Sequence, residues 1–337
     1  MTLPTRALGT HQVSAISLGC MSLSHAYAPI PSADQGAALL NKALDLGITH
    51  FDTAALYGFG ANERLLASAI GHRRADYVLA SKCVLGEVNG KRGLDGRPEA
   101  IAASIDASLE RLQTDHIDLM YLHRLDRNVP IEESVGALVR AKEAGKIGAL
   151  GLSEMSAETV RRAHAVHPIA ALQTEYSPMV RNPEVAVLET CRELGIAFVA
   201  FSPVARGLLA DRIRSDAYGE GDLRSQFPRY SGDNLRHNLA IVDAFNALAA
   251  ELGSTPAQLS LAWVLSRGAH VIAIPGTTSI AHLEEDVGAT DVVLNDAAIA
   301  RIDALFAPGA IRGARYSVAA QAQVGTELLP NEELASD

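Results

Sequence analysis

The feature that most constrains the fold is a repeated alternation of short apolar segments with longer amphipathic ones. The apolar segments have the Val-, Ile- and Leu-rich composition of buried strands, and the stretches between them carry apolar residues at helical spacing. Successive strand starts are mostly 24–42 residues apart, which suits one strand–helix unit each. The eight predicted strands are 16–18, 48–52, 77–82, 119–123, 147–152, 171–175, 197–201 and 271–274.

Eight such units predict an α/β fold, a (β/α)8 TIM barrel. Continuous apolar strands such as FVAF (198–201) and VIAI (271–274) are typical of a parallel sheet that is covered on both faces. A doubly wound parallel sheet is the structural alternative. The number of strands and the lack of a GxGxxG motif after the first strand argue against it.

Several segments lie outside the bare repeat. Residues 5–14 are predicted to form a short hairpin that closes the barrel floor, and 84–97, with four glycines, is predicted to be a mobile loop. A polar loop over 211–232 and two helical patterns predict extra helices between the seventh strand and the C-terminus. We therefore expect one domain over 1–316, followed by a tail over 317–337 that is either a flap or disordered.

Composition excludes several classes of protein. Hydrophobic residues make up 48% and charged residues 20%, which is typical of a globular chain. The 29 basic and 39 acidic residues give a net charge of −10, so no nucleic-acid partner is expected. No apolar run is long enough for a membrane span, no signal peptide is visible, and the three dispersed cysteines predict neither disulfides nor a metal site. A cytoplasmic protein is expected, and its oligomeric state is not predicted.

Four ionisable residues follow the second, third and fourth predicted strands. These are Asp52, Tyr57, Lys82 and His123. Each has an ordinary structural interpretation, such as a turn cap for Asp52 or a half-buried aromatic for Tyr57. In a barrel, however, the carboxyl ends of these strands surround one mouth, and that is where such barrels carry their chemistry. A concentration of titratable groups there indicates a catalytic site.

Several motifs in this order resemble the aldo-keto reductase superfamily, over about residues 5–316. They are FDTAALYG, the lysine of LASK, LMYLH, GLSEMSAETV, TEYSP, FSPVARGLL and IPGTTSIAHLEEDVGA. The seventh-strand segment and FPRYSGDN resemble the bacterial and plant branch of aldehyde and pyridoxal reductases. The resemblance implies reduction of an aldehyde or ketone, with Tyr57 as proton donor, Lys82 and Asp52 as its activators, and His123 orienting the carbonyl.

The same resemblance implies a nicotinamide cofactor. Ser153 and Gln173 match residues that bind the carboxamide, Phe201 matches the residue that stacks on the ring, and residues 202–207 match the turn beneath the pyrophosphate. The complete set of expected cofactor-binding residues is Met21, Asp52, Ser153, Gln173, Phe201, Ser202, Pro203, Val204, Gly207, Gly276, Thr278, His282, Glu285 and Asp286.

The cofactor-binding run departs from the commonest family pattern. Many relatives have lysine or arginine where Thr278, Ser279 and His282 stand, so the 2′-phosphate of NADPH would meet less positive charge. Asp286, where asparagine is frequent, is expected to add a negative charge near the adenosine. NADPH is the expected cofactor, with NADH possible.

A charge argument independent of the family concerns Tyr57. A free tyrosine has a pKa of about 10, and a lysine ammonium about 4 Å away stabilises phenolate by about 4 kcal/mol at an effective dielectric of about 20. Lys82 is therefore expected to bring the pKa of Tyr57 close to neutrality, while Asp52 keeps Lys82 charged.

Two other functions fit part of the pattern. A Schiff-base aldolase would use Lys82 but would leave Tyr57 and Phe201 without roles. A non-enzymatic cofactor sensor, similar to the β subunits of potassium channels, would keep the cofactor strip without turnover. The substrate is a small carbonyl compound of unspecified identity, and the residues expected around it are Met21, Tyr27, Val84, Arg124, Met179 and the tail.

Overall fold

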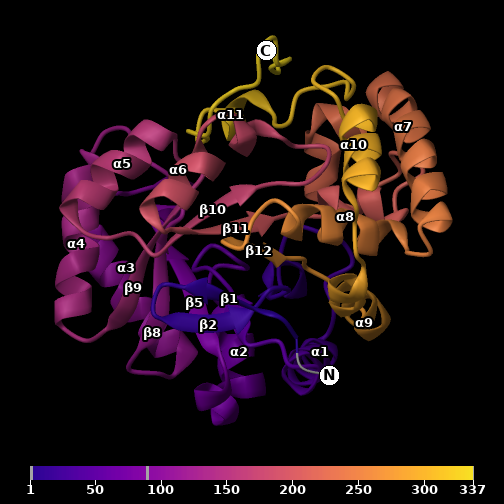
Figure 1. The fold of residues 1–337 in the computed structure, drawn as a ribbon. Coiled ribbons are helices and arrows are strands. Elements are labelled where there is room, and N and C mark those ends of the chain that lie inside the picture. The colour runs from indigo at the N-terminus through magenta and orange to yellow at the C-terminus, as the bar shows by residue number, and fades with distance from the viewer. Residues whose placement is uncertain (1–2, 89–90, 337) are drawn as a thin grey trace.

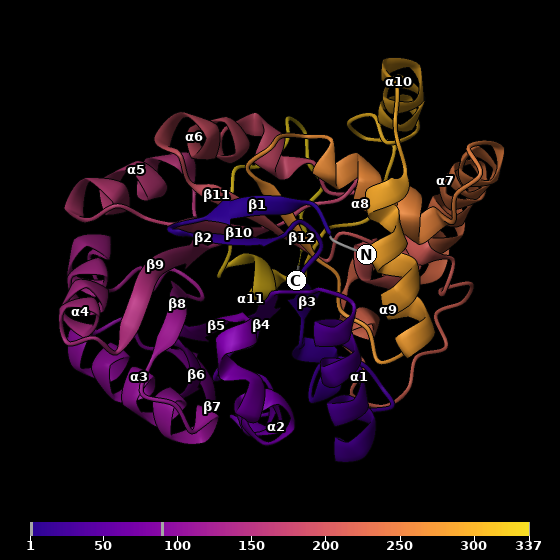
Figure 2. The same cartoon turned by 60° about the horizontal axis from the view of Figure 1, so that its bottom comes forward.

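The computed structural model describes residues 3–88 and 91–336 and contains the predicted barrel. Eight parallel strands follow one another around it in chain order, and helices surround them (Figures 1 and 2). The barrel strands are β3 (Leu18–Gly19), β4 (His50–Asp52), β5 (Val78–Cys83), β8 (Ile117–Leu122), β9 (Ile147–Ser153), β10 (Ala171–Glu175), β11 (Ala197–Phe201) and β12 (Val271–Ile274). The prediction of a (β/α)8 barrel is thereby confirmed.

The barrel closes between its first and last strands. The backbone N–H of Ser17 donates to the carbonyl of Ala273 at 2.9 Å, and Gly19 donates to Pro275 at 3.0 Å. A Cβ on Gly19 would lie 2.9 Å from the carbonyl oxygen of Ile274, so the close approach requires glycine. Because the first strand is short, it is joined to β12 partly through an isolated bridge at Ile16.

The helices around the barrel pack apolar side chains against it. They are α1 (Ala33–Asp45), α2 (Ala61–Ile70), α3 (Pro98–Leu112), α4 (Ile131–Glu143), α5 (Ala157–Val166), α6 (Val187–Leu194), α8 (Pro256–Leu265) and α9 (Ile280–Val287). Of these, α8 is buried on nearly all sides. The expected extra helices are also present, as α7 (Gly232–Glu251), α10 (Asp296–Leu305) and the short α11 (Val318–Gln321). None of the helices formed by the described residues is long and apolar enough to span a membrane.

The barrel has a closed end and an open end. The predicted hairpin forms from β1 (Thr5–Leu8) and β2 (His11–Ser14), and its Leu8 and Val13 pack with Leu119 and Tyr121 inside the barrel. The C-terminal tail lies at the opposite end (Figure 1). The open end is therefore the one to which the carboxyl ends of the strands point.

The loop predicted over 84–97 is instead a second antiparallel hairpin, although positions 89 and 90 fall outside the described residues. It consists of β6 (Leu85–Val88) and β7 (Lys91–Leu94). Leu85 is buried against Leu56 and Tyr57, and Leu94 packs on the same cluster. These apolar contacts hold the glycine-containing segment against the barrel mouth.

Candidate active site

A cavity of about 640 Å³ opens at the carboxyl ends of the strands. Its walls include most of the residues that the sequence predicted as site residues. The predicted residues that line it are Met21, Asp52, Tyr57, His123, Ser153, Gln173, Phe201, Ser202, Pro203, Val204, Gly207, Gly276, Thr278, His282, Glu285 and Asp286. Lys82 does not line it, because it lies beneath Tyr57 and is fully buried.

Lys82, Asp52 and Tyr57 form one buried cluster. The Lys82 ammonium donates to a carboxylate oxygen of Asp52, to the backbone carbonyl of Thr53 at 2.8 Å, and to the Tyr57 hydroxyl at 3.1 Å. The other Asp52 oxygen accepts a 2.7 Å hydrogen bond from the Gln173 amide. These contacts fix the direction of the lysine and present the Tyr57 hydroxyl to the cavity.

The charge state of this cluster differs from the expectation for Tyr57. Although burial lowers the pKa of Lys82, Asp52 and Tyr57 raise it above its ordinary value, so the lysine is charged. Burial raises the pKa of Tyr57 above its usual value, and Lys82 offsets that only in part. The expected pKa near neutrality is therefore wrong. The charge of Lys82 is already balanced by Asp52, so it cannot outweigh the cost of burying a phenolate.

His123 directly follows β8 and faces Tyr57. The two rings meet edge to face, with centroids 5.9 Å apart. Burial, with Arg124 and Lys82 nearby, holds the pKa of His123 well below its usual value. The imidazole is therefore neutral at pH 7 and keeps one N–H to donate.

Ser153, the last residue of β9, is paired in register with Gln173, the middle residue of β10. Arg124 donates to the Ser153 hydroxyl oxygen at 3.1 Å, which leaves the hydroxyl proton free for another acceptor. The Gln173 amide nitrogen is occupied by Asp52, which leaves its oxygen available. A neighbouring hydroxyl and carbonyl oxygen of this kind can bind a carboxamide, and Phe201 is half-buried at the next strand end.

The chain after β11 turns through a run of left-handed backbone. Ser202, Ala205 and Arg206 have φ of 49°, 47° and 54°, and Gly207 has φ of 96°. Only glycine adopts the last of these without strain, so the turn explains the need for Gly207. Successive residues in such conformations point backbone N–H groups to one side, which suits a pyrophosphate.

The N-terminus of α9 forms the far end of the cavity. Thr278 and His282 line it, but the Ser279 hydroxyl instead caps the helix by accepting from the His282 N–H at 3.4 Å. Burial, with the nearby Arg212, lowers the pKa of His282. Burial, with the nearby Glu285, raises the pKa of Asp286 to about 8. Asp286 is therefore neutral at pH 7 in the free protein, which corrects the expected negative charge.

Three arginines around the cavity were not predicted as site residues. Arg206, Arg212 and Arg224 all line the cavity. Arg206 lies inside the FSPVARGLL segment, so the sequence could have indicated it as a site residue. The other two lie in the polar loop over 211–232, whose sequence has no periodicity that would place them. Arg212 lies beside α9, 3.7 Å from the carboxylate of Glu285, whereas Arg206 is paired with Glu175 and Arg224 with Asp222. Arg212 is therefore the one of the three that adds positive charge near the Thr278–His282 run.

Other expectations for the substrate end are mixed. Met21, Tyr27 and Arg124 line the cavity, as do residues of the tail, whereas Val84 and Met179 do not. Both are buried in the hydrophobic core instead.

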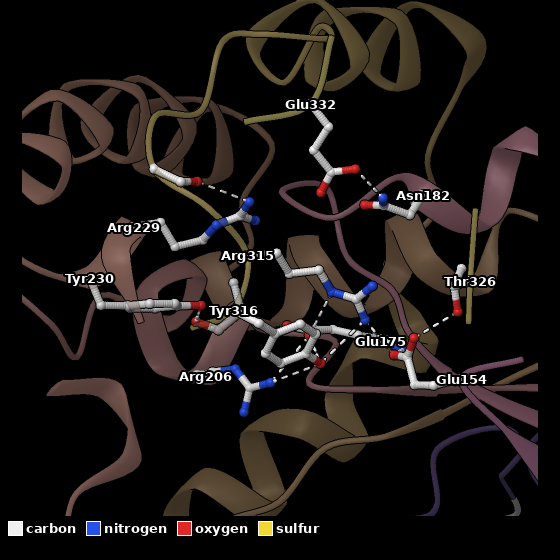
Figure 3. A network of polar contacts seen from close by, with 12 residues as sticks. Glu154, Glu175, Asn182, Arg206, Arg229, Tyr230, Arg315, Tyr316, Thr326 and Glu332 are labelled. Atoms are coloured by element: carbon white, nitrogen blue, oxygen red, sulfur yellow. Dashed lines mark hydrogen bonds and ion pairs between the residues drawn. The ribbon is translucent and has the colours of Figure 1, made fainter. Parts of the chain in front are cut away.

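A buried ionic network lies directly before the tail, and Thr326 of the tail donates to its Glu154 at 2.7 Å (Figure 3). Arg315 donates to Glu154 and, through Nε, to Glu175 at 3.0 Å. The Tyr316 hydroxyl donates to the same Glu175 oxygen at 2.5 Å, and Arg206 contacts it at 3.2 Å. Although burial raises the pKa of Glu175, Arg206 and Arg315 hold it at about 2. The network thus connects the tail to the turn after β11.

Comparisons with known proteins find relatives over nearly the whole chain. A sequence model of the aldo/keto reductase family matches residues 15–307. The chain is 40% identical to the aldo-keto reductase yakc [NADP(+)] of Schizosaccharomyces pombe, over 98% of this chain and 99% of that protein. Among solved structures, it is similar to the glycerol dehydrogenase AKR11B4 from Gluconobacter oxydans, with a TM-score of 0.82, 28% identity and 98% of both chains covered. An aldo/keto reductase from Klebsiella pneumoniae in complex with NADP and acetate has a TM-score of 0.71 and 28% identity, covering 94% of this chain and 99% of that one.

Proposed function

Because the chain belongs to the aldo/keto reductase family, we propose that it reduces an aldehyde or ketone to the alcohol with NADPH. Tyr57 is the general acid. The observation that carries the proposal is the 3.1 Å contact between the Tyr57 hydroxyl and a buried, charged Lys82 at the cavity wall. The NADP in the names of one relative and one similar structure supports the choice of cofactor, and NADH remains the alternative.

The residues along the cavity fit a dinucleotide. Ser153 and Gln173 would bind the carboxamide beside Phe201, the turn at Gly207 would bind the pyrophosphate, and His282 with Arg212 would face the 2′-phosphate. When bound, the reduced nicotinamide supplies a hydride to the carbonyl carbon.

The protein's own part is proton transfer and polarisation. Neutral His123 donates its N–H to the carbonyl oxygen and orients it. Tyr57, protonated at pH 7 because burial raises its pKa, gives its proton to that oxygen as negative charge develops there. Lys82 stabilises the phenolate that remains, and Asp52 keeps Lys82 charged and directed.

The surroundings of Lys82 argue against a Schiff-base aldolase. That chemistry needs a neutral amine that can reach the substrate carbonyl. Lys82 is fully buried, donates to three oxygens, and has a raised pKa. A sensor without turnover would not need His123 and Tyr57 to meet at the cavity wall.

The proposal extends to the organisation of the chain. Residues 1–316 act as one catalytic domain, and 317–337 act as a flap that covers the mouth. The partner is a small carbonyl compound, and the location is the cytoplasm.

The test is loss of NADPH absorbance with a panel of aldehydes and ketones, for the native protein and for Tyr57→Phe. Removing the hydroxyl should lower carbonyl reduction by about 100-fold or more, while NADPH binding, followed by fluorescence quenching, is retained. Tyr77→Phe is the matched control, since Tyr77 lies at the opposite end of β5 and does not line the cavity. Near-native reduction by Tyr57→Phe would contradict the assignment of the acid.

A further inference from the structure

Two guanidinium groups contact no carboxylate at the end of the cavity that holds Tyr57 and His123, which we call the carbonyl end. Arg92 comes from β7 and Arg124 follows His123, and both line the cavity together with Tyr57. Arg124 donates to the carbonyl of His123 at 2.6 Å and to the hydroxyl oxygen of Ser153 at 3.1 Å. Arg92 has a 3.3 Å contact with the side-chain oxygen of Gln323 in the tail. Within 3–88 and 91–336, no Asp or Glu oxygen lies within 4.0 Å of either group.

The other cationic side chains around the cavity are paired with carboxylates. Lys82 is paired with Asp52, Arg206 with Glu175, and Arg224 with Asp222. Glu87 stands opposite Arg92 in the hairpin register, and both are exposed to solvent, but only Arg92 lines the cavity. The carbonyl end therefore holds uncompensated positive charge.

The two arginines are close enough to repel one another. Burial, with the charge of Arg124, lowers the pKa of Arg92. Both arginines also contribute to lowering the pKa of His123. Arg92 is exposed to solvent, which screens part of this repulsion, and an anion bound between the two groups would neutralise the rest. This local positive charge occurs in a chain whose net charge is −10.

The cofactor phosphates do not account for this charge. Their expected contacts, at Gly207, Thr278 and His282, lie toward the other end of the cavity. Arg124 instead contacts Ser153, which is expected to bind the nicotinamide carboxamide. An anion at the Arg92–Arg124 pair would stand beside the reacting carbonyl, in the space left for the substrate.

We propose that the preferred substrate carries an anionic group, a carboxylate or a phosphate, which Arg92 and Arg124 bind while the carbonyl lies against Tyr57 and His123. The inference rests on the proposed reductase function and specifies its substrate class. Guanidinium suits the role because its planar fork of N–H donors matches both kinds of oxyanion. Gln323 gives the tail a part in the same subsite, since its side chain touches Arg92.

The experiment compares matched carbonyl compounds that differ in charge. 4-Carboxybenzaldehyde and methyl 4-formylbenzoate have similar size and carbonyl reactivity, but only the first is an anion at pH 7. Glyceraldehyde 3-phosphate and glyceraldehyde form the phosphate pair. We expect the native enzyme to favour the anion of at least one pair by about 10- to 100-fold in kcat/KM, as for a charged hydrogen bond.

Variants assign that preference to the two arginines. Arg92→Met should abolish most of it and leave kcat/KM for the neutral partner within about threefold. Arg124→Lys keeps the charge but loses the fork, so it should lose part of the preference. Lys91→Met is the control, because it removes the same charge from the same strand but from a residue that does not line the cavity. Unchanged neutral turnover by Arg92→Met also shows that the variant is folded.

The outcomes separate this inference from the proposed function. Equal kcat/KM for anionic and neutral partners in both pairs would overturn the substrate class but leave the reductase intact. An anion preference that Arg92→Met and Lys91→Met reduce equally would overturn the assignment to Arg92. Reduction of none of the four compounds or of any other carbonyl, with NADPH bound, would contradict the reductase function itself.

Discussion

Removal of Arg315 should test whether the buried network holds the tail. The Arg315, Glu154 and Glu175 side chains are 2%, 0% and 2% exposed, so water screens these charges little. In Arg315→Met, Glu175 keeps Arg206 as a partner, but Glu154 keeps only neutral donors among the described residues, including Thr326 at 2.7 Å. A buried carboxylate without a cation is therefore left behind.

Breaking a buried ion pair in this way costs about 3–5 kcal/mol. We therefore expect Arg315→Met to lower the free energy of unfolding by that amount, measured by urea titration with circular dichroism. The tail should also become a site of rapid proteolysis after about residue 316, because its docking contacts are lost. Adding Glu154→Gln should recover part of the loss, since the amide is neutral.

Arg97→Met is the matched control. Its ion pair with Asp95 involves a side chain that is 60% exposed, so solvent screens the pair and its loss should barely change the free energy of unfolding. If Arg315→Met were as stable as this control, the network would not be what holds the tail. The same conclusion would follow if Glu154→Gln made Arg315→Met less stable still.

Three further predictions concern charge. Lys82→Met should raise the pKa of Tyr57 further, because the larger of its two cationic offsets is lost and only Arg124 remains. The pH–rate profile of alcohol oxidation should therefore move to higher pH while the NADP+ dissociation constant changes little; an unmoved profile would refute the pairing. The preference for NADP+ over NAD+ should rise as pH falls below about 6.5, because burial lowers the pKa of His282 and only the protonated ring adds a charged contact. His282→Arg should strengthen that preference by about 1–3 kcal/mol and make it independent of pH. Fluorescence quenching across pH 5–8 would show both effects. Burial lowers the pKa of His50 to about 4 in the folded chain, so as pH falls the unfolded chain binds a proton at this histidine before the folded chain does. The free energy of unfolding should therefore fall by about 1.4 kcal/mol per pH unit between about pH 6.5 and 4. Urea titrations of His50→Leu should show a shallower pH dependence, and an equal slope would remove His50 as the cause.

The sequence by itself determined the barrel and much of the position of the site. Apolar runs at the spacing of strand–helix units require a closed parallel sheet, and the carboxyl ends of its strands share one mouth. Asp52 and Lys82 could therefore be placed together from their positions at strand ends, before their contact was observed. These are consequences of local periodicity, which a single sequence carries in full.

Only the tertiary structure determined the charge states of the buried groups and the contacts that position the tail. Burial raises the pKa values of Tyr57 and Asp286, and burial depends on every element that excludes water from them. The Arg315–Glu175 pair joins positions 140 residues apart, and no local pattern indicates which distant carboxylate an arginine will meet. Periodicity specifies which face of an element is covered. The free energy of a buried charge depends on which other charges share its low-dielectric surroundings, and only the folded chain brings those together.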